Sequence, residues 1–215
     1  MKEISVRTVV IGSGCAGLNA ADWLWDLGQR DLLLVPENMN SGTSRNTGSD
    51  KQTYYKLSLS GDEGDSVGAL AAMLLGNHGD VNGDTALCEA AASAKSFFKL
   101  AGLGVPFPCN EYGEYVGYQT DHDHFRRATS AGPLTSKFMT EALEKSVRGK
   151  GVPIRDQALA CRILTDETGV AGVLCLDKTD RDWLRPCGAV HRRPGADLPG
   201  QRVSPEPVRH ERHGL

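Results

Sequence analysis

A strand, a glycine-rich turn, a helix and a second strand near the N-terminus constrain the fold of this chain more than any other feature. Residues 7–34 read RTVVIGSGCAGLNAADWLWDLGQRDLLL, in which β-branched residues run into the turn and an apolar strand follows the helix. The helical part carries apolar residues at the spacing of one helix face, namely Leu18, Ala21, Trp23 or Leu24, and Leu27. A G-x-G-x-x-G turn in such a βαβ unit is typical of proteins that bind a dinucleotide.

Each glycine of this turn has its own reason to lack a side chain. Gly12 permits the tight turn, Gly14 lets a pyrophosphate approach the backbone, and Gly17 lets the helix pack closely on the strand. The N–H groups at the helix N-terminus, including those of Cys15 and Ala16, would face the phosphates, where the backbone dipoles favour negative charge. A βαβ turn without a ligand is the alternative.

An acidic residue follows the second strand. Glu37 comes 20 residues after Gly17, near the spacing of about 20 at which this class of site places a carboxylate on the adenosine ribose. A carboxylate there accepts hydrogen bonds from the ribose hydroxyls and repels a 2′-phosphate, so the sequence disfavours NADP. Glu37 could instead be an ordinary exposed turn residue after Pro36.

The next segment separates two kinds of dinucleotide domain. Residues 41–56 read SGTSRNTGSDKQTYYK, and their small polar residues and glycines predict a loop and not a helix. Together with the glycine turn, this loop resembles the FAD-binding domain of the fumarate reductase and succinate dehydrogenase flavoprotein family. The resemblance implies a loop that wraps the pyrophosphate and reaches the isoalloxazine ring. The contacts that it implies are Gly42, Thr43, Ser44, Gly48 and Ser49.

The same resemblance implies how the cofactor is attached. Respiratory members bind FAD covalently through a histidine in this loop, whereas this chain has Arg45 and Asn46 there. We therefore expect non-covalent FAD. An NAD-dependent dehydrogenase remains the alternative, and it would normally have a crossover helix in place of the loop; a long polar surface loop is another alternative.

The middle of the chain carries weaker signals. Residues 65–75 and 85–100 predict helices, and residues 102–118, rich in glycine, proline and aromatic residues, predict irregular strand and loop.

Two histidines follow in the sequence TDHDHFRR. His122 and His124, alternating with Asp121 and Asp123 on an extended chain, suggest a metal site, a substrate or flavin-edge contact, or a solvated loop. Because no third ligand has a defined spacing, we expect no metal.

The resemblance returns in the last part of the chain before residue 178. It comprises a helix over residues 135–148 with Phe138, Leu143 and Val147 on one face, a short strand at 152–155, and a hairpin of strands 160–165 and 170–176. In relatives the end of the short strand lies near the adenine, which makes Ala158 a contact candidate. We expect an incomplete α/β fold over residues 1–180, of the Rossmann-type FAD-binding class, with three layers, a parallel sheet and a β-hairpin or meander.

Residues 181–215 differ in character. They hold seven Arg, no Lys and five of the ten Pro of the chain, a composition that predicts a disordered tail. The family has a strand and a second glycine motif, A-T-G-G, at this point. Read one nucleotide later, with permitted wobble bases, the codons of residues 191–203 can encode T-G-G-P-G-R-I-Y-Q-D-S-V, so we expect the tail to be out of frame. A genuine basic tail that contacts an acidic partner is the alternative.

The resemblance also bears on activity. Complete relatives are FAD-dependent oxidoreductases that transfer a hydride through flavin N5, act on small saturated or unsaturated carboxylate or carbonyl compounds, and can work with an electron-transfer subunit. Their substrate-binding Arg and His residues lie in a capping domain that this chain lacks, so no catalytic residue is assigned. We expect a fragment that binds FAD weakly or not at all; a non-enzymatic nucleotide-binding module is the alternative.

Composition excludes several other classes. A net charge of −3 and a pI near 6.1 argue against nucleic acid as a main partner. No apolar run is long enough to span a membrane, and Met1–Val10 is not a signal peptide. The six cysteines show no C-x-x-C spacing, which fits reduced thiols in the cytoplasm and no zinc site.

Overall fold

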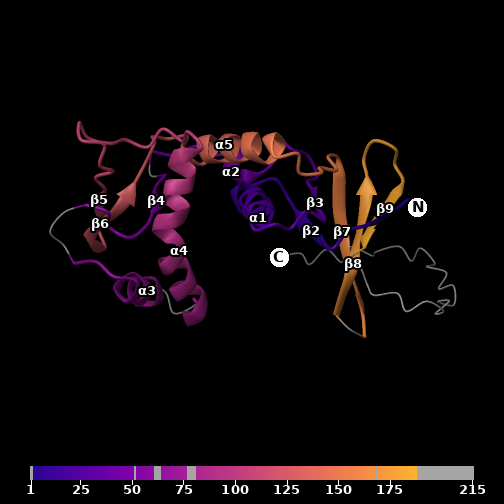
Figure 1. The fold of residues 1–215 in the computed structure, drawn as a ribbon, viewed down its shortest axis with the longest axis horizontal. Helices are drawn as coiled ribbons and strands as arrows, with labels where there is room; N and C mark the ends of the chain where they lie inside the picture. The colour runs from indigo at the N-terminus through magenta and orange to yellow at the C-terminus, as the bar shows by residue number, and fades with distance from the viewer. Residues whose placement is uncertain (1, 51, 61–63, 77–80, 168, 188–215) are drawn as a thin grey trace, which may run out of the picture.

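The computed structural model describes residues 2–50, 52–60, 64–76, 81–167 and 169–187. Its elements are, in chain order, β1 (Lys2–Ser5), β2 (Thr8–Ile11), α1 (Cys15–Asp26), β3 (Leu32–Val35), α2 (Thr43–Asn46), β4 (Tyr54–Tyr55), α3 (Val67–Gly76), α4 (Gly83–Gly102), β5 (Tyr118–Thr120), β6 (Asp123–Thr129), α5 (Thr135–Gly149), β7 (Ala158–Asp166), β8 (Gly169–Asp177) and β9 (Trp183–Cys187). Figure 1 shows their arrangement.

The core has three layers, and strand β3 lies in the middle one. β2 and β3 pair in parallel, from Thr8 opposite Leu32 to Ile11 opposite Val35. Because side chains alternate along a strand, Leu32 and Leu34 pack against the helices, in one cluster with residues of α1, α4 and α5, whereas Leu33 and Val35 pack against residues of β7, β8 and β9. The expected three-layer α/β fold is confirmed.

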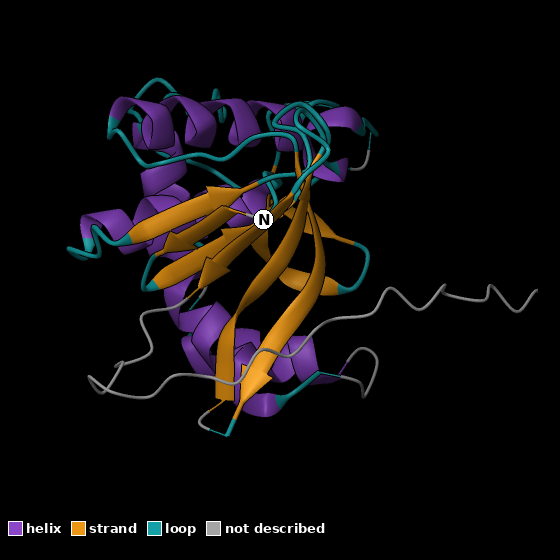
Figure 2. Cartoon of the chain, turned by 90° about the vertical axis from the view of Figure 1, so that its right-hand side faces the viewer, coloured by secondary structure: helices purple, strands orange, loops and turns teal. Residues whose placement is uncertain are grey.

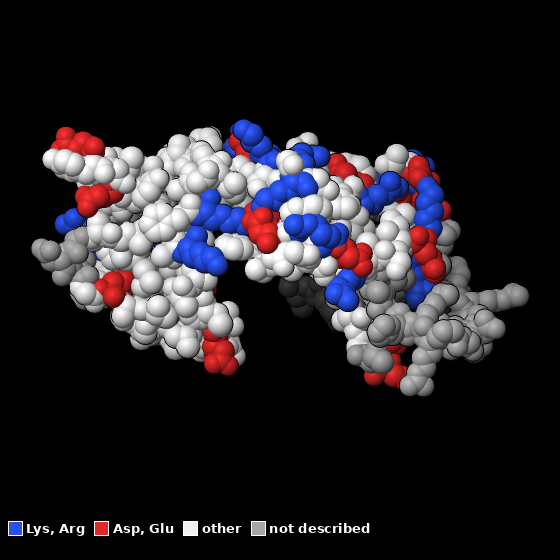
Figure 3. All heavy atoms as spheres, viewed as in Figure 1, with Lys and Arg blue, Asp and Glu red and all other residues white. Residues whose placement is uncertain are grey.

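The third layer is a sheet in the order β1-β9-β8-β7. β7, β8 and β9 follow one another antiparallel, which is the predicted hairpin extended by one strand into a meander, and β1 joins β9 in parallel. Figure 2 shows these strands in front of the helices. In the space-filling view of Figure 3, basic and acidic side chains lie interspersed over the middle and right of the molecule.

A second lobe, on the left of Figure 1, consists of α3, α4 and the small antiparallel sheet β4-β6-β5. Aromatic rings fill the space between α4 and this sheet: the Phe97 ring lies 4.8 Å from that of Phe107, 5.0 Å from that of Tyr115 and 5.8 Å from that of Tyr54, measured between centroids. The two predicted middle helices are confirmed, within a few residues at each end, as α3 and α4.

The predicted apolar face of α1 is right at its centre and wrong at its end. Leu18 and Ala21 are fully buried and Leu24 packs partly into the core. Leu27, in contrast, is 77% exposed, because the helix ends at Asp26 and the chain turns away there. Of the two alternatives at the third position, Leu24 faces the core, whereas the Trp23 ring lies under the ammonium groups of two lysines of α4.

Three further expectations need correction. The segment at 152–155 forms only one parallel bridge, between Ile154 and Leu34, because Pro153 has no N–H to extend the ladder. Residues 41–56, which we expected to form a loop and not a helix, contain the one-turn helix α2 and the short strand β4.

The tail expected over residues 181–215 also begins too early in the sequence. Trp183–Cys187 forms strand β9, which pairs with β1 on one side and β8 on the other. The rest of that segment, including the codons considered for a second frame, lies outside the described residues.

Candidate cofactor-binding site

The glycine turn between β2 and α1 has the geometry that its sequence predicts. Gly12 has a φ of +96°, in the left-handed region that favours glycine, and its N–H donates to the Val35 carbonyl at 3.0 Å. A Cβ at Gly17 would lie 2.2 Å from the carbonyl oxygen of Gly12. No side chain fits in that space, so Gly17 is required for the close approach of α1 to the turn.

The N-terminus of α1 has the features of an anion-binding site. Its N-cap residue, Gly14, has no side chain, and the first turn holds no acidic residue. The first N–H groups of a helix have no partner within the helix and carry the positive end of its dipole. These are the properties that bind phosphate groups at helix N-termini, and the residues present therefore fit the pyrophosphate of a dinucleotide.

A second turn lies directly against this helix end. Ser44, in α2, accepts a hydrogen bond at its Oγ from the Cys15 N–H at 3.3 Å. A Cβ at Gly42 would lie 3.6 Å from the backbone nitrogen of Gly14, and Gly42 has a φ of +111°. The structure thus brings the Gly42–Ser44 segment and the glycine turn together, as the resemblance implied.

Gly48 and Ser49 lie elsewhere along the same loop. The Ser49 N–H donates to the Pro133 carbonyl at 3.1 Å, and a Cβ at Gly48 would lie 3.3 Å from both the Pro133 carbonyl oxygen and the Leu134 side chain. These two residues therefore pack on the turn that precedes α5, and their expected contacts with FAD stay a prediction.

The two predicted adenosine contacts differ in accessibility. Glu37 follows β3, is 52% exposed, and forms an ion pair with Lys178 at 3.1 Å, so its carboxylate can meet a ribose. Ala158 is fully buried in the cluster with Leu33 and Val35. Its side chain packs in the core, and the adenine contact expected at Ala158 stays a prediction.

Helix α5, which runs along the top of the molecule in Figure 1, holds both halves of the site. The Cys15 thiol lies 3.0 Å from the Thr140 hydroxyl, and the Ser136 N–H donates to the Gln52 side chain at 3.0 Å. Arg45 of α2 forms an ion pair with Glu144. No local sequence pattern signals these contacts, because each joins residues more than 80 positions apart.

A buried charge also fixes α1 to its neighbours. Asp22 is fully buried and forms ion pairs with Lys99 of α4 at 2.5 Å and with Lys150 at 2.8 Å, and it accepts a hydrogen bond from Ser146 at 2.6 Å. Burial by itself would raise the pKa of this carboxyl, but the bonds from Lys150, Lys99 and Ser146 outweigh it and hold the pKa below its ordinary value.

Sequence reasoning also missed Lys56, whose side chain is fully buried. Its ammonium lies 4.8 Å from the centre of the Phe97 ring and 3.5 Å from the Leu57 carbonyl oxygen. Burial lowers the pKa of Lys56 to about 8.

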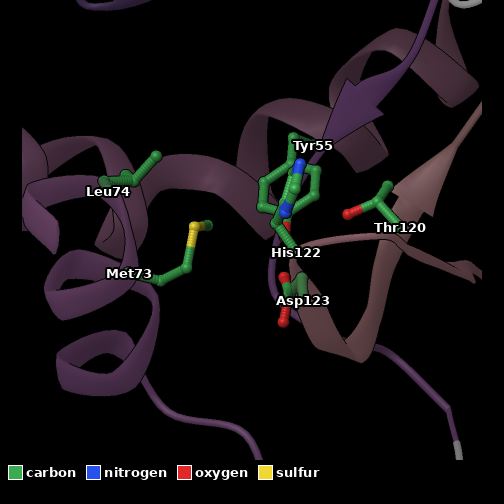
Figure 4. Close-up of a pocket in the computed structure, with 6 residues that line it drawn as sticks. All are labelled: Tyr55, Met73, Leu74, Thr120, His122 and Asp123. Carbon is green, nitrogen blue, oxygen red and sulfur yellow. The ribbon is translucent and has the colours of Figure 1, made fainter. Parts of the chain in front are cut away.

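The two histidines lie in the second lobe. His122, in the β5–β6 turn, lines a cavity of about 260 Å³ with Tyr55, Met73, Leu74, Thr120 and Asp123. Figure 4 shows Met73 and Leu74 on α3 facing Tyr55 and His122 across it. His124 is exposed. Among the described residues, no three His, Cys, Asp or Glu side chains are placed to hold a metal ion, and no helix is long and apolar enough to cross a membrane.

Fold and site together define a dinucleotide-binding α/β domain. A sequence model of the family described as "FAD binding domain" matches residues 7–188. This chain therefore belongs to the FAD binding domain family, and the expectation of FAD as cofactor is confirmed.

Known proteins share this domain within much longer chains. L-aspartate oxidase of Streptomyces coelicolor is 25% identical over 190 residues, which are 87% of this chain and 32% of the relative. Among solved structures, E. coli quinol fumarate reductase FrdA matches with a TM-score of 0.72 at 16% identity, over 87% of this chain and 32% of its own. Mycobacterium smegmatis Sdh1 matches with a TM-score of 0.73 at 15% identity, over 87% and 33%. The chain thus spans about a third of the length of each relative.

Proposed function

We propose that this chain is the nucleotide-binding part of an FAD-dependent oxidoreductase of the fumarate reductase, succinate dehydrogenase and aspartate oxidase type. The observation that carries the proposal is the meeting of two turns. A hydrogen bond joins the N-terminus of α1, which is capped by a glycine, to the Gly42–Ser44 segment. Glu37 lies at the end of the neighbouring strand β3, where the adenosine of the same ligand would extend.

The roles of the residues follow from this arrangement. The Cys15 N–H donates to Ser44 Oγ, so the N–H groups of Ala16 and Gly17 would donate to the pyrophosphate, and the hydroxyls of Thr43 and Ser44 would supply further donors. Glu37 would accept from the ribose hydroxyls. When bound, FAD supplies hydride transfer at flavin N5; the protein residues described here bind and orient its ADP half.

We further propose that FAD is held without a covalent bond. Arg45 and Asn46 occupy the loop position of the attached histidine in respiratory relatives, and both side chains are engaged elsewhere: Asn46 donates to the carbonyls of Asn40 at 2.8 Å and Gly42 at 3.1 Å, and Arg45 pairs with α5. Acid precipitation of the FAD-loaded protein should release all flavin into the supernatant. Flavin absorbance that stays with the precipitated chain would refute this.

We propose the substrate and partners of the complete enzyme from those of its relatives. The relatives named above are an L-aspartate oxidase and a quinol fumarate reductase, so we propose a small carboxylate or carbonyl compound as the substrate of the complete enzyme, in the cytoplasm, with an electron-transfer partner. We also propose that the codons after residue 187 are out of frame, on the alternative reading of residues 191–203 given above. Sequencing the coding DNA tests this, because an open frame with no inserted or deleted base would refute it.

Titration of the purified 215-residue chain with FAD tests the main proposal. We expect weak, reversible binding that ADP displaces and riboflavin does not, because the contacts described here belong to the ADP half. Gly17→Val is the matched control, since its side chain has no space beside the Gly12 carbonyl; circular dichroism would establish that the variant is folded. The sequence left open weak binding or none, and the geometry of the phosphate site favours weak binding. Absence of binding to wild type at millimolar FAD, or displacement by riboflavin instead of ADP, would therefore contradict the proposal.

A further inference from the structure

Arg45 stands in the middle of the cofactor loop, but its side chain turns away from the glycine turn. The guanidinium is only 13% exposed and forms an ion pair with Glu144, itself 17% exposed, on α5. A second carboxylate of the same helix, Glu141, lies 3.8 Å from Arg45 Nη1. The neighbouring residue in the chain, Ser44, instead accepts a hydrogen bond from the Cys15 N–H. Within the single turn of α2, one residue therefore contacts α1 and the next contacts α5.

We infer that Arg45 is a positioning residue, which fixes the Gly42–Asn46 turn on α5 so that Ser44 stays at the phosphate site. This inference deepens the proposed function and rests on it. The opposing interpretation is that Arg45 is itself a ligand of the cofactor's phosphates, as arginines in polar loops often are.

A four-residue helix cannot hold its own position. One helical turn is unstable in isolation, because fixing its backbone costs more than its few hydrogen bonds return. The bonds from Thr47 Oγ1 to the Thr43 carbonyl and from Asn46 to the Gly42 carbonyl shape the turn internally. They do not fix it relative to α1. The ion pair to Glu144 does, because α5 is itself joined to α1 through Thr140 and Ser146.

The two interpretations predict opposite effects of removing the charge of Glu144. If Arg45 positions the turn, Glu144→Gln releases the turn and weakens nucleotide binding. If Arg45 binds phosphate, the same change frees the guanidinium and removes a negative charge near an anionic ligand, so binding is unchanged or tighter. Arg45→Met weakens binding under both interpretations, which makes the Glu144 variant decisive.

The experiment measures the Kd of ADP and of FAD for the wild type and for Arg45→Met, Arg45→Lys, Glu144→Gln and the Arg45→Met/Glu144→Gln double variant. We expect Arg45→Met and Glu144→Gln each to raise the Kd of both ligands by about tenfold, the scale of a partly buried ion pair. The double variant should bind no more weakly than either single variant. Arg45→Lys should restore part of the loss. Lys137→Met, which removes an exposed partner of Glu141 on the same helix, should change the Kd by less than about twofold.

Unchanged or tighter binding by Glu144→Gln, or additive losses in the double variant, would overturn the inference while leaving the proposed function intact. A wild type that binds neither ADP nor FAD would count against both. If Arg45→Met fails to fold, as judged by circular dichroism, the Glu144→Gln variant still decides the question.

Discussion

Replacing the buried lysine in the second lobe should make this protein more stable. The Lys56 side chain is fully buried, and the contacts of its ammonium are the Leu57 carbonyl at 3.5 Å and the face of the Phe97 ring. Methionine has a similar length and no charge, so Lys56→Met keeps the packing and removes the cost of burying the ammonium.

The size of the effect follows from the pKa. Burial lowers the pKa of Lys56 from 10.5 to about 8, which corresponds to about 3 kcal/mol at pH 7, at about 1.4 kcal/mol per pKa unit. Because the folded-state pKa is the lower one, the unfolded chain binds more protons between pH 8 and 10.5, and wild-type stability rises with pH in that window. The advantage of Lys56→Met should therefore fall to about 2 kcal/mol at pH 9 and below about 1 kcal/mol at pH 10.

Urea unfolding of both proteins at pH 7, 9 and 10 measures this difference directly. Lys145→Met, which removes an exposed lysine of α5, is the control and should change the unfolding free energy by less than about 0.5 kcal/mol. The reasoning is refuted if Lys56→Met is less stable than wild type at pH 7, or if the difference between the two proteins does not shrink as the pH rises.

Other predictions concern the contacts around the glycine turn. Asp22→Ala leaves Lys99 and Lys150 without their shared buried carboxylate and should cost about 3–5 kcal/mol in urea unfolding. Because the pKa of Asp22 is lowered in the folded state, this difference from wild type should shrink as the pH falls through that pKa, and a difference that does not change with pH would argue against the ion pairs. Gly17→Ala places a Cβ 2.2 Å from the Gly12 carbonyl oxygen and should lower both the melting temperature and the affinity for ADP; an unchanged ADP Kd would be incompatible with the site. Glu37→Gln should weaken ADP binding by about three- to tenfold without changing stability, and an equal loss in unfolding free energy would indicate a structural role instead.

Local sequence patterns predicted the parts of the fold that local interactions build. The βαβ unit, the helices α3, α4 and α5, and the β7–β8 hairpin each carry their own periodicity or turn residues, and all are present. Strand β9 was missed because WLRPC has a proline, an arginine and no alternation. It becomes a strand through pairing with β8, which ends at Asp177, and with β1, which the N-terminal end of the chain supplies.

Local sequence patterns likewise predicted the parts of the candidate site that lie close together in the sequence. The glycine turn and Gly42–Ser44, which the structure brings together, could be proposed because their residue types suit the backbone conformation and phosphate contact. Gly48 and Ser49 share those types and pack on the turn before α5. The contribution of α5 could not be found, since no local pattern signals that Arg45 meets Glu144 or that Cys15 meets Thr140. Burial of Lys56 was equally hidden, because a lysine after two tyrosines gives no sign that it will lie against Phe97.

The central claim is that the glycine turn and the Gly42–Asn46 turn form one phosphate site. Hydrogen–deuterium exchange of the wild-type chain, with and without saturating ADP, tests it most directly. The account predicts slower exchange in peptides covering residues 12–18 and 42–49 together, with no change at the exposed end of the β7–β8 hairpin. Protection of only one of the two turns, or protection confined to the second lobe, would contradict it.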